Sequence, residues 1–219
     1  NALFYNAANL FISCLMLSYR HAFHAGNHAD VLKHFVLQQV LSYTNQKDKA
    51  YWYIDTHAVA GMYALDHGYA MQNAEFEQGI ARLWQADDLP APLQSFVDLI
   101  RQLNPAQALR HYPGSPGVAQ ALLRPSDRMR LFELHPSDAK LLRQHFKPAG
   151  RLALIEQEDG FAGLKALLPP PPRRAVVLID PPYEEKRDYQ RVIEALKDSL
   201  QRFATGTYLL WSPLLQRAE

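Results

Sequence analysis

The feature that most constrains the fold is a series of short apolar runs, most of which reach an acidic residue at their end. The runs are YWYID ending at Asp55, MRLFE ending at Glu133, RLALIEQED reaching Asp159, AVVLID ending at Asp180, and TYLLW ending at Trp211. Runs this short and this apolar are typical of strands buried on both faces of a parallel sheet. Helical patterns over 136–146 and 189–203 alternate with them. The sequence therefore predicts a doubly wound α/β fold.

The acids at the ends of these runs indicate where a ligand would bind. In an open α/β sheet, ligands bind outside the carboxyl ends of the strands, close to the point where the strand order reverses. Carboxylates there can accept hydrogen bonds from ribose hydroxyls or from a base amine. The alternative for any one of them is a helix N-cap or a turn residue, a role that aspartate fills at many strand-to-helix turns. Four such acids in succession favour a ligand site.

The spacing of the runs predicts an insertion between the first two strands. Glu133 and Asp159 are 26 positions apart, which suits one strand and one helix, whereas Asp55 and Glu133 are 78 apart. The extra length contains two helical patterns separated by a polar, proline-containing stretch. We therefore expect an inserted small helical subdomain over 62–112, with helices at 76–84 and 92–103.

The remaining segments, 16–61 and 113–219, are assigned to one domain that carries the sheet. We expect the sheet to resume through 113–116, and Ser115 to cap a helix over 117–123. Residues 1–15 are apolar but contain no Lys or Arg, so they lack the charged start of a secretory signal. We interpret them as an extension upstream of a natural start at Met16.

The composition is that of an ordinary globular protein, with 48% hydrophobic and 21% charged residues. The net charge is only +1, so the overall charge does not indicate a nucleic-acid partner. The single cysteine, Cys14, excludes a disulfide framework within the chain and fits a cytoplasmic protein. No apolar run approaches the ~20 residues that a membrane-spanning helix needs, so we expect no membrane partner.

Four histidines gather near the start of the sequence, which raises the question of a metal site. They lie within fourteen residues, at positions 21, 24, 28 and 34. The chain has neither an H-E-x-x-H nor a C-x-x-C motif, so we expect no metal. A polar segment that faces RNA or a cofactor, with Asn27 and Lys33 beside the histidines, suits the pattern better. Histidines that are simply exposed or that cap helices are the alternative.

The segment with the clearest chemistry is Asp180-Pro181-Pro182-Tyr183, which directly follows the apolar run AVVLI. An exocyclic base amine is a poor nucleophile because its lone pair is delocalised into the ring. A carboxylate that accepts one N–H and a backbone carbonyl that accepts the other would turn the nitrogen toward tetrahedral geometry, and Asp180 and Pro181 supply both. Proline has no N–H to compete. Tyr183 supplies a face for a base that has left its stack. The motif indicates N-methylation with S-adenosylmethionine as the methyl donor.

With these residues in hand, the chain closely resembles the RlmJ family of large-subunit ribosomal RNA adenine-N6 methyltransferases. The resemblance begins at Met16 and runs to the end of the chain. Its motifs, in order, are MLSYRHAFHAGNHADVLKH, DTHAVAG, EFEQGIARLWQADDLPA, YPGSP, ELHPSD, EDGF, DPPY and RFATGTYLLW. The resemblance implies a Rossmann-like class I methyltransferase sheet, an S-adenosyl-L-methionine cofactor with S-adenosylhomocysteine as its product, and 23S ribosomal RNA as partner. It also fits a cytoplasmic protein that acts as a monomer.

The resemblance also implies roles for single residues. The opening segment would close over the active site, with Tyr19 and Lys33 facing the RNA. Asp180 would contact the methionine end of the cofactor or the target amine, in a catalytic group with Pro181, Pro182 and Tyr183, and Tyr183 would stack on the flipped base. The residues expected to hold the cofactor are His34, His57, Ser115, Glu133, Asp159, Gly160 and Asp180.

Two departures from the family pattern bear on the site. The family's turn after the first strand resembles Asp-Thr-His-Ala-Gly-Ala-Gly, and here Val59 stands at the first of those glycines. If that position needs a positive φ, a β-branched residue is costly there. Sheets of this class also usually end in an antiparallel pair of strands. No such pair is found before Glu219, so we expect the C-terminal strands to be missing.

The leading hypothesis is therefore N6-methylation of an adenine in 23S ribosomal RNA, with the base flipped into a pocket formed by the DPPY segment. A second hypothesis keeps the chemistry but changes the acceptor to adenine in DNA or to another amine or amide nitrogen, because DPPY does not separate these. A third is a non-catalytic RNA-binding module that has lost cofactor affinity.

Overall fold

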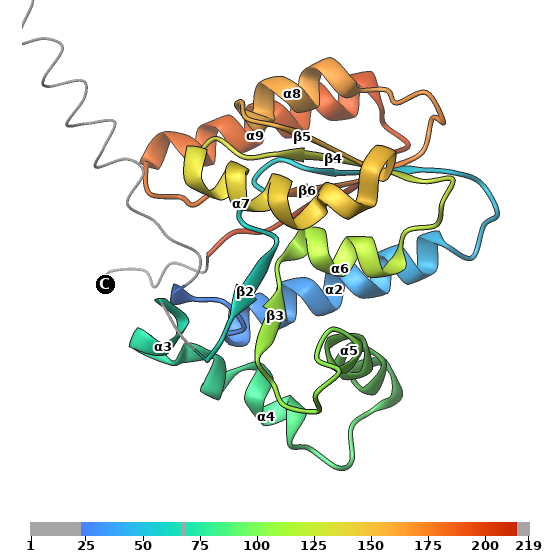
Figure 1. Cartoon of the computed structure of the whole chain (residues 1–219). Coiled ribbons are helices and arrows are strands. Elements are labelled where there is room, and N and C mark those ends of the chain that lie inside the picture. Colours follow the sequence, from blue (N-terminus) through green and yellow to red (C-terminus); the bar gives the residue numbers. More distant parts are fainter. Residues whose placement is uncertain (1–22, 67–68, 214–219) are drawn as a thin grey trace, which may run out of the picture.

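A five-stranded parallel sheet forms the centre of the protein, whose computed structural model describes residues 23–66 and 69–213. The strand order is β5-β4-β1-β6-β7, and every neighbouring pair is parallel (Figure 1). This confirms the doubly wound α/β fold. The strands are β1 (Trp52–Asp55), β4 (Arg128–Phe132), β5 (Ala153–Glu156), β6 (Ala175–Ile179) and β7 (Thr207–Leu210).

Helices cover both faces of this sheet because side chains alternate along each strand. In β6, Val176 and Leu178 belong to one buried cluster, and Val177 and Ile179 belong to another. The first cluster packs against α2, α6 and α7, and the second packs against α8 and α9. The helices are α2 (His28–Thr44), α6 (Ser115–Leu122), α7 (Pro136–Phe146) with the 3₁₀ helix η3 (Lys147–Leu152) after it, α8 (Gly160–Leu167) and α9 (Lys186–Arg202).

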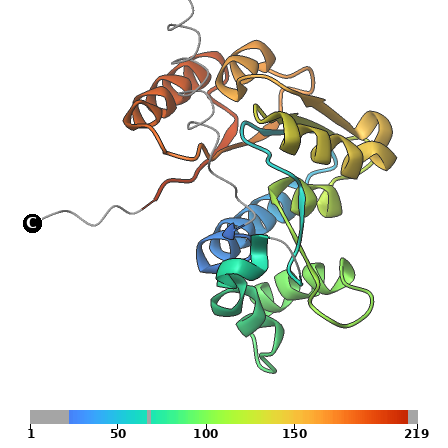
Figure 2. The ribbon, with the colours of Figure 1, turned by 60° about the vertical axis from the view of Figure 1, so that its left-hand side comes forward.

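The segment between β1 and α6 forms a lobe on the side of the sheet where α2 lies (Figure 2). Its elements are β2 (Met62–Ala64), α3 (Tyr69–Asn73), the 3₁₀ helix η2 (Glu75–Gln78), α4 (Ile80–Trp84), α5 (Ala91–Gln102) and β3 (His111–Pro113). The lobe has a core of its own, in which Ile80, Phe96 and Ile100 are fully buried. We keep the division of the chain at 62–112 as a proposal.

Two details of the lobe differ from the sequence-based expectation. The strand at 111–113 does not resume the main sheet, because it pairs antiparallel with β2 in a separate two-stranded sheet. The helix expected over 76–84 is divided at Gly79 into η2 and α4. A Cβ at Gly79 would lie 2.1 Å from the carbonyl oxygen of Gly26, so the backbone of the lobe is pressed against the start of α2 there.

Ser115 is not the N-cap that the sequence suggested. α6 begins at Ser115 itself, Gly114 occupies the N-cap position, and no side chain caps this end of the helix. The Ser115 hydroxyl instead donates to Asp55 at 2.6 Å. The prediction was wrong because the sequence cannot show that a buried carboxylate on β1 competes for this hydroxyl.

The main sheet ends at β7 within the part of the chain that the structure describes. β7 is parallel to β6, so the antiparallel pair expected for this class of sheet is not among those residues. The segment 1–15 lies outside the described residues, as does Met16. Within 23–66 and 69–213, no helix is both long enough and apolar enough to cross a membrane.

Candidate active site

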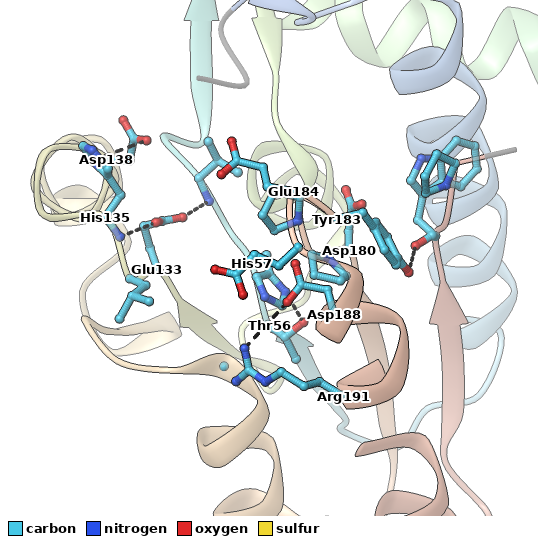
Figure 3. Close-up of a pocket in the computed structure, with 18 of the residues that line it drawn as sticks. Thr56, His57, Glu133, His135, Asp138, Asp180, Tyr183, Glu184, Asp188 and Arg191 are labelled. Atoms are coloured by element: carbon cyan, nitrogen blue, oxygen red, sulfur yellow. Dashed lines mark hydrogen bonds and ion pairs between the residues drawn. The ribbon is translucent and has the colours of Figure 1, made fainter. Parts of the chain in front are cut away.

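A cavity of about 740 Å³ opens at the carboxyl ends of the strands. It lies where β1 and β6 are neighbours, the point at which the chain switches from building one half of the sheet to building the other. All four residues of the DPPY segment line it, together with His57, Glu133, Asp159 and Gly160. Figure 3 shows Glu133 on one side of the cavity, Asp180 and Tyr183 on the other, and His57 between them.

Glu133 follows β4 and is held by two backbone groups. One carboxylate oxygen accepts the N–H of Val59 at 2.8 Å, and the other accepts the N–H of His135 at 2.6 Å. Burial raises the pKa of Glu133 to about 7, against these two hydrogen bonds, which lower it. The carboxylate is therefore fixed in direction and retains lone pairs that can accept ribose hydroxyls.

Asp55, the first of the strand-end acids, does not line the cavity. Its side chain is fully buried and accepts hydrogen bonds from the hydroxyls of Tyr53 and Ser115, at 2.7 and 2.6 Å. Its other oxygen accepts the backbone N–H of His57 at 3.2 Å. Burial raises the pKa of Asp55. Asp55 thus ties the turn after β1 to the start of α6 rather than reaching a ligand.

The turn after β1 carries His57 and Val59 to the cavity wall. Burial lowers the pKa of His57 to about 4, so the imidazole is neutral near pH 7. Its ring packs edge-on against Phe161, with 5.1 Å between the ring centres. Val59 has a φ of +54°, which is the left-handed conformation that the glycine of the family pattern would adopt without strain. This position therefore does have the positive φ that is costly for a β-branched residue. Val59 adopts it at a conformational cost, and its N–H donates to Glu133.

Asp159 is the N-cap of α8, one of the two roles that the sequence left open, and it also lines the cavity. Its side chain accepts the N–H groups of Phe161 and Ala162. It also forms an ion pair with Arg191 of α9, which stacks its guanidinium over the Phe161 ring. Burial raises the pKa of Asp159, but the bonds from Arg191 outweigh burial and the pKa is lowered. Gly160 has no room for a Cβ, which would lie 2.0 Å from the carbonyl oxygen of Thr56.

Asp180 follows β6 and is bound by a buried lysine from α2. Lys33 Nζ donates to Asp180 Oδ2 at 2.6 Å and to Asp30 Oδ1 at 2.9 Å. The Lys33 side chain is only 6% exposed. Burial lowers the pKa of this amine, yet the two carboxylates together raise it above its ordinary value. Among the described residues, Asp180 Oδ1 has no hydrogen-bond partner and is the oxygen available to a ligand.

Tyr183 lies on the same side of the cavity as Asp180 (Figure 3), and neighbouring residues hold it in place. Its φ is +55°, and its hydroxyl donates to the backbone carbonyl of Trp211 at 2.8 Å (Figure 3). Its ring lies against that of Tyr189, with 4.7 Å between the ring centres. Burial, with Asp180 nearby, raises the pKa of Tyr183 to about 12, so the hydroxyl remains a donor near pH 7.

Two residues predicted for the site, His34 and Ser115, lie behind the cavity wall. His34 is buried beside the lobe, with its Nδ1 at 3.0 Å from the hydroxyl of Tyr112. Ser115 is buried against Asp55, and neither side chain is part of the cavity lining. Tyr19 lies outside the described residues. Lys33, expected to face RNA, lines the cavity, and its side chain is largely buried against Asp180.

The sequence analysis missed two side chains that shape the cavity, Asp30 and Arg191. The sequence did contain a signal for Asp30. It stands one helical turn before Lys33, a spacing that favours an ion pair. Nothing in the sequence connects Arg191 to Asp159, because the two belong to different strand–helix units.

The lining is strongly acidic, which bears on the ligand that fits. Nine Asp or Glu side chains line the cavity, against one Lys and two Arg. The sulfonium and ammonium groups of S-adenosylmethionine are cations and suit such a lining, and Glu133 suits its ribose. The phosphates of a nucleic acid would be repelled, so a base can enter only with its phosphates outside. Within 23–66 and 69–213, no group of three or more His, Cys, Asp or Glu side chains could hold a metal ion.

Comparison with known proteins gives a matching family model and two curated relatives. Residues 48–219 match the RsmJ family model, described as "Ribosomal RNA large subunit methyltransferase D, RlmJ". The chain is 52% identical over 204 residues to ribosomal RNA large subunit methyltransferase J of Escherichia coli, covering 93% of the chain and 72% of that protein. For the protein of the same name from Haemophilus influenzae, the identity is 47%, with 93% and 73% covered.

A solved structure has the same fold. The crystal structure of protein LPL1258 from Legionella pneumophila, assigned to the family model DUF519, superposes with a TM-score of 0.80 at 38% sequence identity. The superposition covers 87% of this chain and 70% of the Legionella chain.

Proposed function

Because the chain belongs to the RlmJ family of ribosomal RNA large subunit methyltransferases, we propose that its cavity transfers a methyl group from S-adenosylmethionine to N6 of an adenine in 23S ribosomal RNA. The protein is an enzyme of the methyltransferase class, and S-adenosylmethionine is its cofactor. The residue roles given below are part of the proposal. We also propose that it acts as a monomer in the cytoplasm, where bacterial ribosomes are assembled.

One half of the cavity suits the cofactor. Glu133 would accept the ribose hydroxyls, because its two backbone bonds leave lone pairs directed into the cavity. Asp159 and Gly160 would border the adenine ring, and His57 would lie beside the methionine part as a neutral group. S-adenosylmethionine supplies an activated methyl group on a sulfonium. His34 and Ser115 would act from behind this wall, since neither side chain lines the cavity.

The other half suits a flipped base. Asp180 Oδ1 would accept one N–H of the exocyclic amine, and the carbonyl of Pro181 would accept the other. The nitrogen lone pair would then be freed from the ring and aimed at the methyl group. Tyr183 would stack on the base, since its own hydroxyl is fixed on Trp211. Lys33 would hold Asp180 in this orientation through Oδ2. Most of the acceleration would come from positioning and from fixed charges.

The observation that carries this proposal is the placement of Asp180-Pro181-Pro182-Tyr183. The segment follows β6 at the switch point of the sheet and lines the same cavity as Glu133 and Asp159. A turn formed by two prolines for structural reasons alone would not need a buried lysine on its aspartate.

Methyl transfer from labelled S-adenosylmethionine tests the proposal. The protein is incubated separately with ribosomal RNA that lacks the modification, with DNA and with total protein, and the assay is repeated with Asp180→Ala. Asp48→Ala is the matched control, because Asp48 is fully exposed in the loop between α2 and β1. We expect label in RNA only, lost in Asp180→Ala and kept in Asp48→Ala.

Two results would contradict the proposal. Label in the DNA or protein pool would replace RNA as the acceptor while keeping the chemistry. No label in any pool, together with no cofactor binding by calorimetry, would leave a non-catalytic RNA-binding module.

A further inference from the structure

The carboxylate of Glu75 in η2 joins the inserted lobe to the wall of the cavity. Glu75 Oε2 accepts the side-chain N–H of Asn27 at 2.8 Å and lies 2.9 Å from Nδ1 of His24. Both partners line the cavity, and Asn27 is also the N-cap of α2. Glu75 is half-buried, and the residues it joins are 48 and 51 positions away in sequence.

A series of polar contacts continues from Asn27 to the carboxylate of Asp180. Asn27 Oδ1 accepts the backbone N–H of Asp30 at 2.9 Å, which fixes the first turn of α2. Asp30 Oδ1 then binds Lys33 Nζ at 2.9 Å, and Lys33 Nζ binds Asp180 Oδ2 at 2.6 Å. Four polar contacts in succession therefore lead from the lobe to Asp180.

The backbone around Glu75 leaves little room for independent movement. The N–H of Ile80 donates to the carbonyl of Gly26 at 2.9 Å. Gly79 is so close to Gly26 and Asn27 that a Cβ would lie 2.1 to 2.8 Å from their backbone atoms. A displacement of the lobe would thus pull on the same turn that carries Asn27. Packed segments and hydrogen-bond networks of this kind can carry energetic coupling between two sites.

We propose that Glu75 is a positioning residue, through which the lobe holds the start of α2 so that Lys33 orients Asp180 for the transfer. The inference rests on the proposed function, since it assigns Glu75 a part in that reaction. It gives the lobe a role within catalysis, beyond any contact that it makes with RNA. Glu75 itself is not part of the cavity lining, and it would act through Asn27, Asp30 and Lys33.

Steady-state kinetics with variants of η2 test this role. Glu75→Ala removes the carboxylate, Glu75→Gln keeps an accepting oxygen without the charge, and Glu77→Ala is the control on the same short helix, since Glu77 is exposed. We expect Glu75→Ala to lower kcat about 5- to 20-fold, the size of coupling such networks carry. The cofactor Kd and the melting temperature should stay near the wild-type values. Glu75→Gln should lie between, and Glu77→Ala should match the wild type.

A double-mutant cycle separates positioning from simple loss of stability. If Glu75 acts through Asn27, the variant carrying both Glu75→Ala and Asn27→Ala should be no slower than the slower single variant. If the two losses multiply, the residues act independently and the inference is overturned. A fall in kcat matched by an equal loss of cofactor binding and of melting temperature would show a structural role only, and would also overturn it.

Amide hydrogen exchange tests the same link without relying on activity. Glu75→Ala should speed exchange of the Asp30 N–H, which is bonded to Asn27, while Glu77→Ala leaves it unchanged. Unchanged exchange in Glu75→Ala would overturn the inference. A wild-type protein that methylates no RNA would instead refute the proposed function, and an active wild type with a fully active Glu75→Ala would refute only the role of Glu75.

Discussion

The two halves of the cavity are built in different ways. On the side of β1, β4 and β5, the carboxylates bind backbone N–H groups close to them in sequence or on a neighbouring loop, as Glu133 does with His135 and Val59. On the side of β6, Asp180 is bound by the side chain of Lys33, which is 147 positions away. The cofactor half is thus formed mainly by the turns of the sheet itself. The acceptor half depends on α2, and through α2 on the lobe.

Each half also contains one residue in the left-handed conformation without being glycine. Val59 has a φ of +54° in the cofactor half, and Tyr183 has a φ of +55° in the acceptor half. Strain of this kind persists where the surroundings fix the backbone, and it gathers at functional sites. The comparison indicates that cofactor binding and base positioning can be disturbed separately, which the following variants test.

The largest effect is expected for Asp180→Asn, which replaces the charged acceptor of the amine N–H by a neutral amide and takes an anionic partner from Lys33. Methyl transfer should fall about 1,000-fold, equivalent to about 4 kcal/mol of transition-state stabilisation. The cofactor Kd should change by less than about 5-fold, because the cofactor half is intact. Single-turnover kinetics and calorimetry measure the two quantities. A loss of cofactor binding as large as the loss of rate would show that the halves are not separable.

Asp55→Ala should show the opposite pattern, although Asp55 is also a strand-end acid. Its removal leaves the buried hydroxyls of Tyr53 and Ser115 without their acceptor, so the free energy of unfolding should fall by about 3 kcal/mol. Asp180→Ala should cost less than Asp55→Ala, since Asp180 faces the cavity and Lys33 keeps its bond to Asp30. Urea unfolding monitored by circular dichroism makes the comparison. Equal destabilisation by the two substitutions would contradict the distinction between the acids.

If Glu133 holds the cofactor as proposed, cofactor binding should depend on pH. Ribose hydroxyls would donate to the ionised carboxylate, and burial places its pKa at about 7. The cofactor Kd should therefore rise as pH falls from 8 to 6, while Glu133→Gln should bind about 10- to 30-fold more weakly at pH 8 and lose this dependence. Titration calorimetry across the range measures both. A Kd that is independent of pH in the wild type would remove Glu133 from the ribose.

The same raised pKa gives the free protein the opposite dependence. The folded state holds the Glu133 proton up to about pH 7, whereas the ordinary value is 4.5. This contribution to stability is fully present below pH 4.5 and is lost as pH rises through 7. Without cofactor, the contribution of Glu133 to the free energy of unfolding should therefore decrease as pH rises, while the affinity for the cofactor increases. Glu133→Gln should abolish both of these pH dependences.

The smallest effect is expected at Val59. A residue with a Cβ pays strain at positive φ that glycine avoids, so Val59→Gly should be more stable than Val59→Ala by about 1 kcal/mol. The alanine variant is the appropriate reference because it removes a similar part of the packing while keeping the Cβ. Thermal unfolding of the two variants measures the difference. An alanine variant as stable as the glycine variant would show that the turn does not hold a left-handed residue.

The sheet and its ligand edge could be predicted from the sequence because they depend on local patterns. Each strand is a short apolar run, and Glu133, Asp159 and Asp180 stand where such runs end. The pattern could not separate Asp55 from the other acids. Whether a strand-end acid faces a ligand or the interior depends on what packs beside it, and Ser115 is 60 positions away.

The contacts of α2 and the lobe could not be predicted for the same reason. Lys33 was expected to face RNA, because a lysine among histidines is typical of a polar surface. Its burial results from two carboxylates, of which Asp30 lies one helical turn away and Asp180 lies across the cavity. The division of the helix at Gly79 has an equally distant cause, the backbone of Gly26.

Identification of the methylated nucleoside tests the central claim most directly. Unmodified 23S ribosomal RNA is incubated with the wild-type protein and S-adenosylmethionine, digested to nucleosides, and analysed by chromatography and mass spectrometry. We expect N6-methyladenosine from the wild type and none from Asp180→Asn. A methyl group on a ring nitrogen, on a ring carbon or on the ribose would contradict an acceptor half that is built to hold an exocyclic amine.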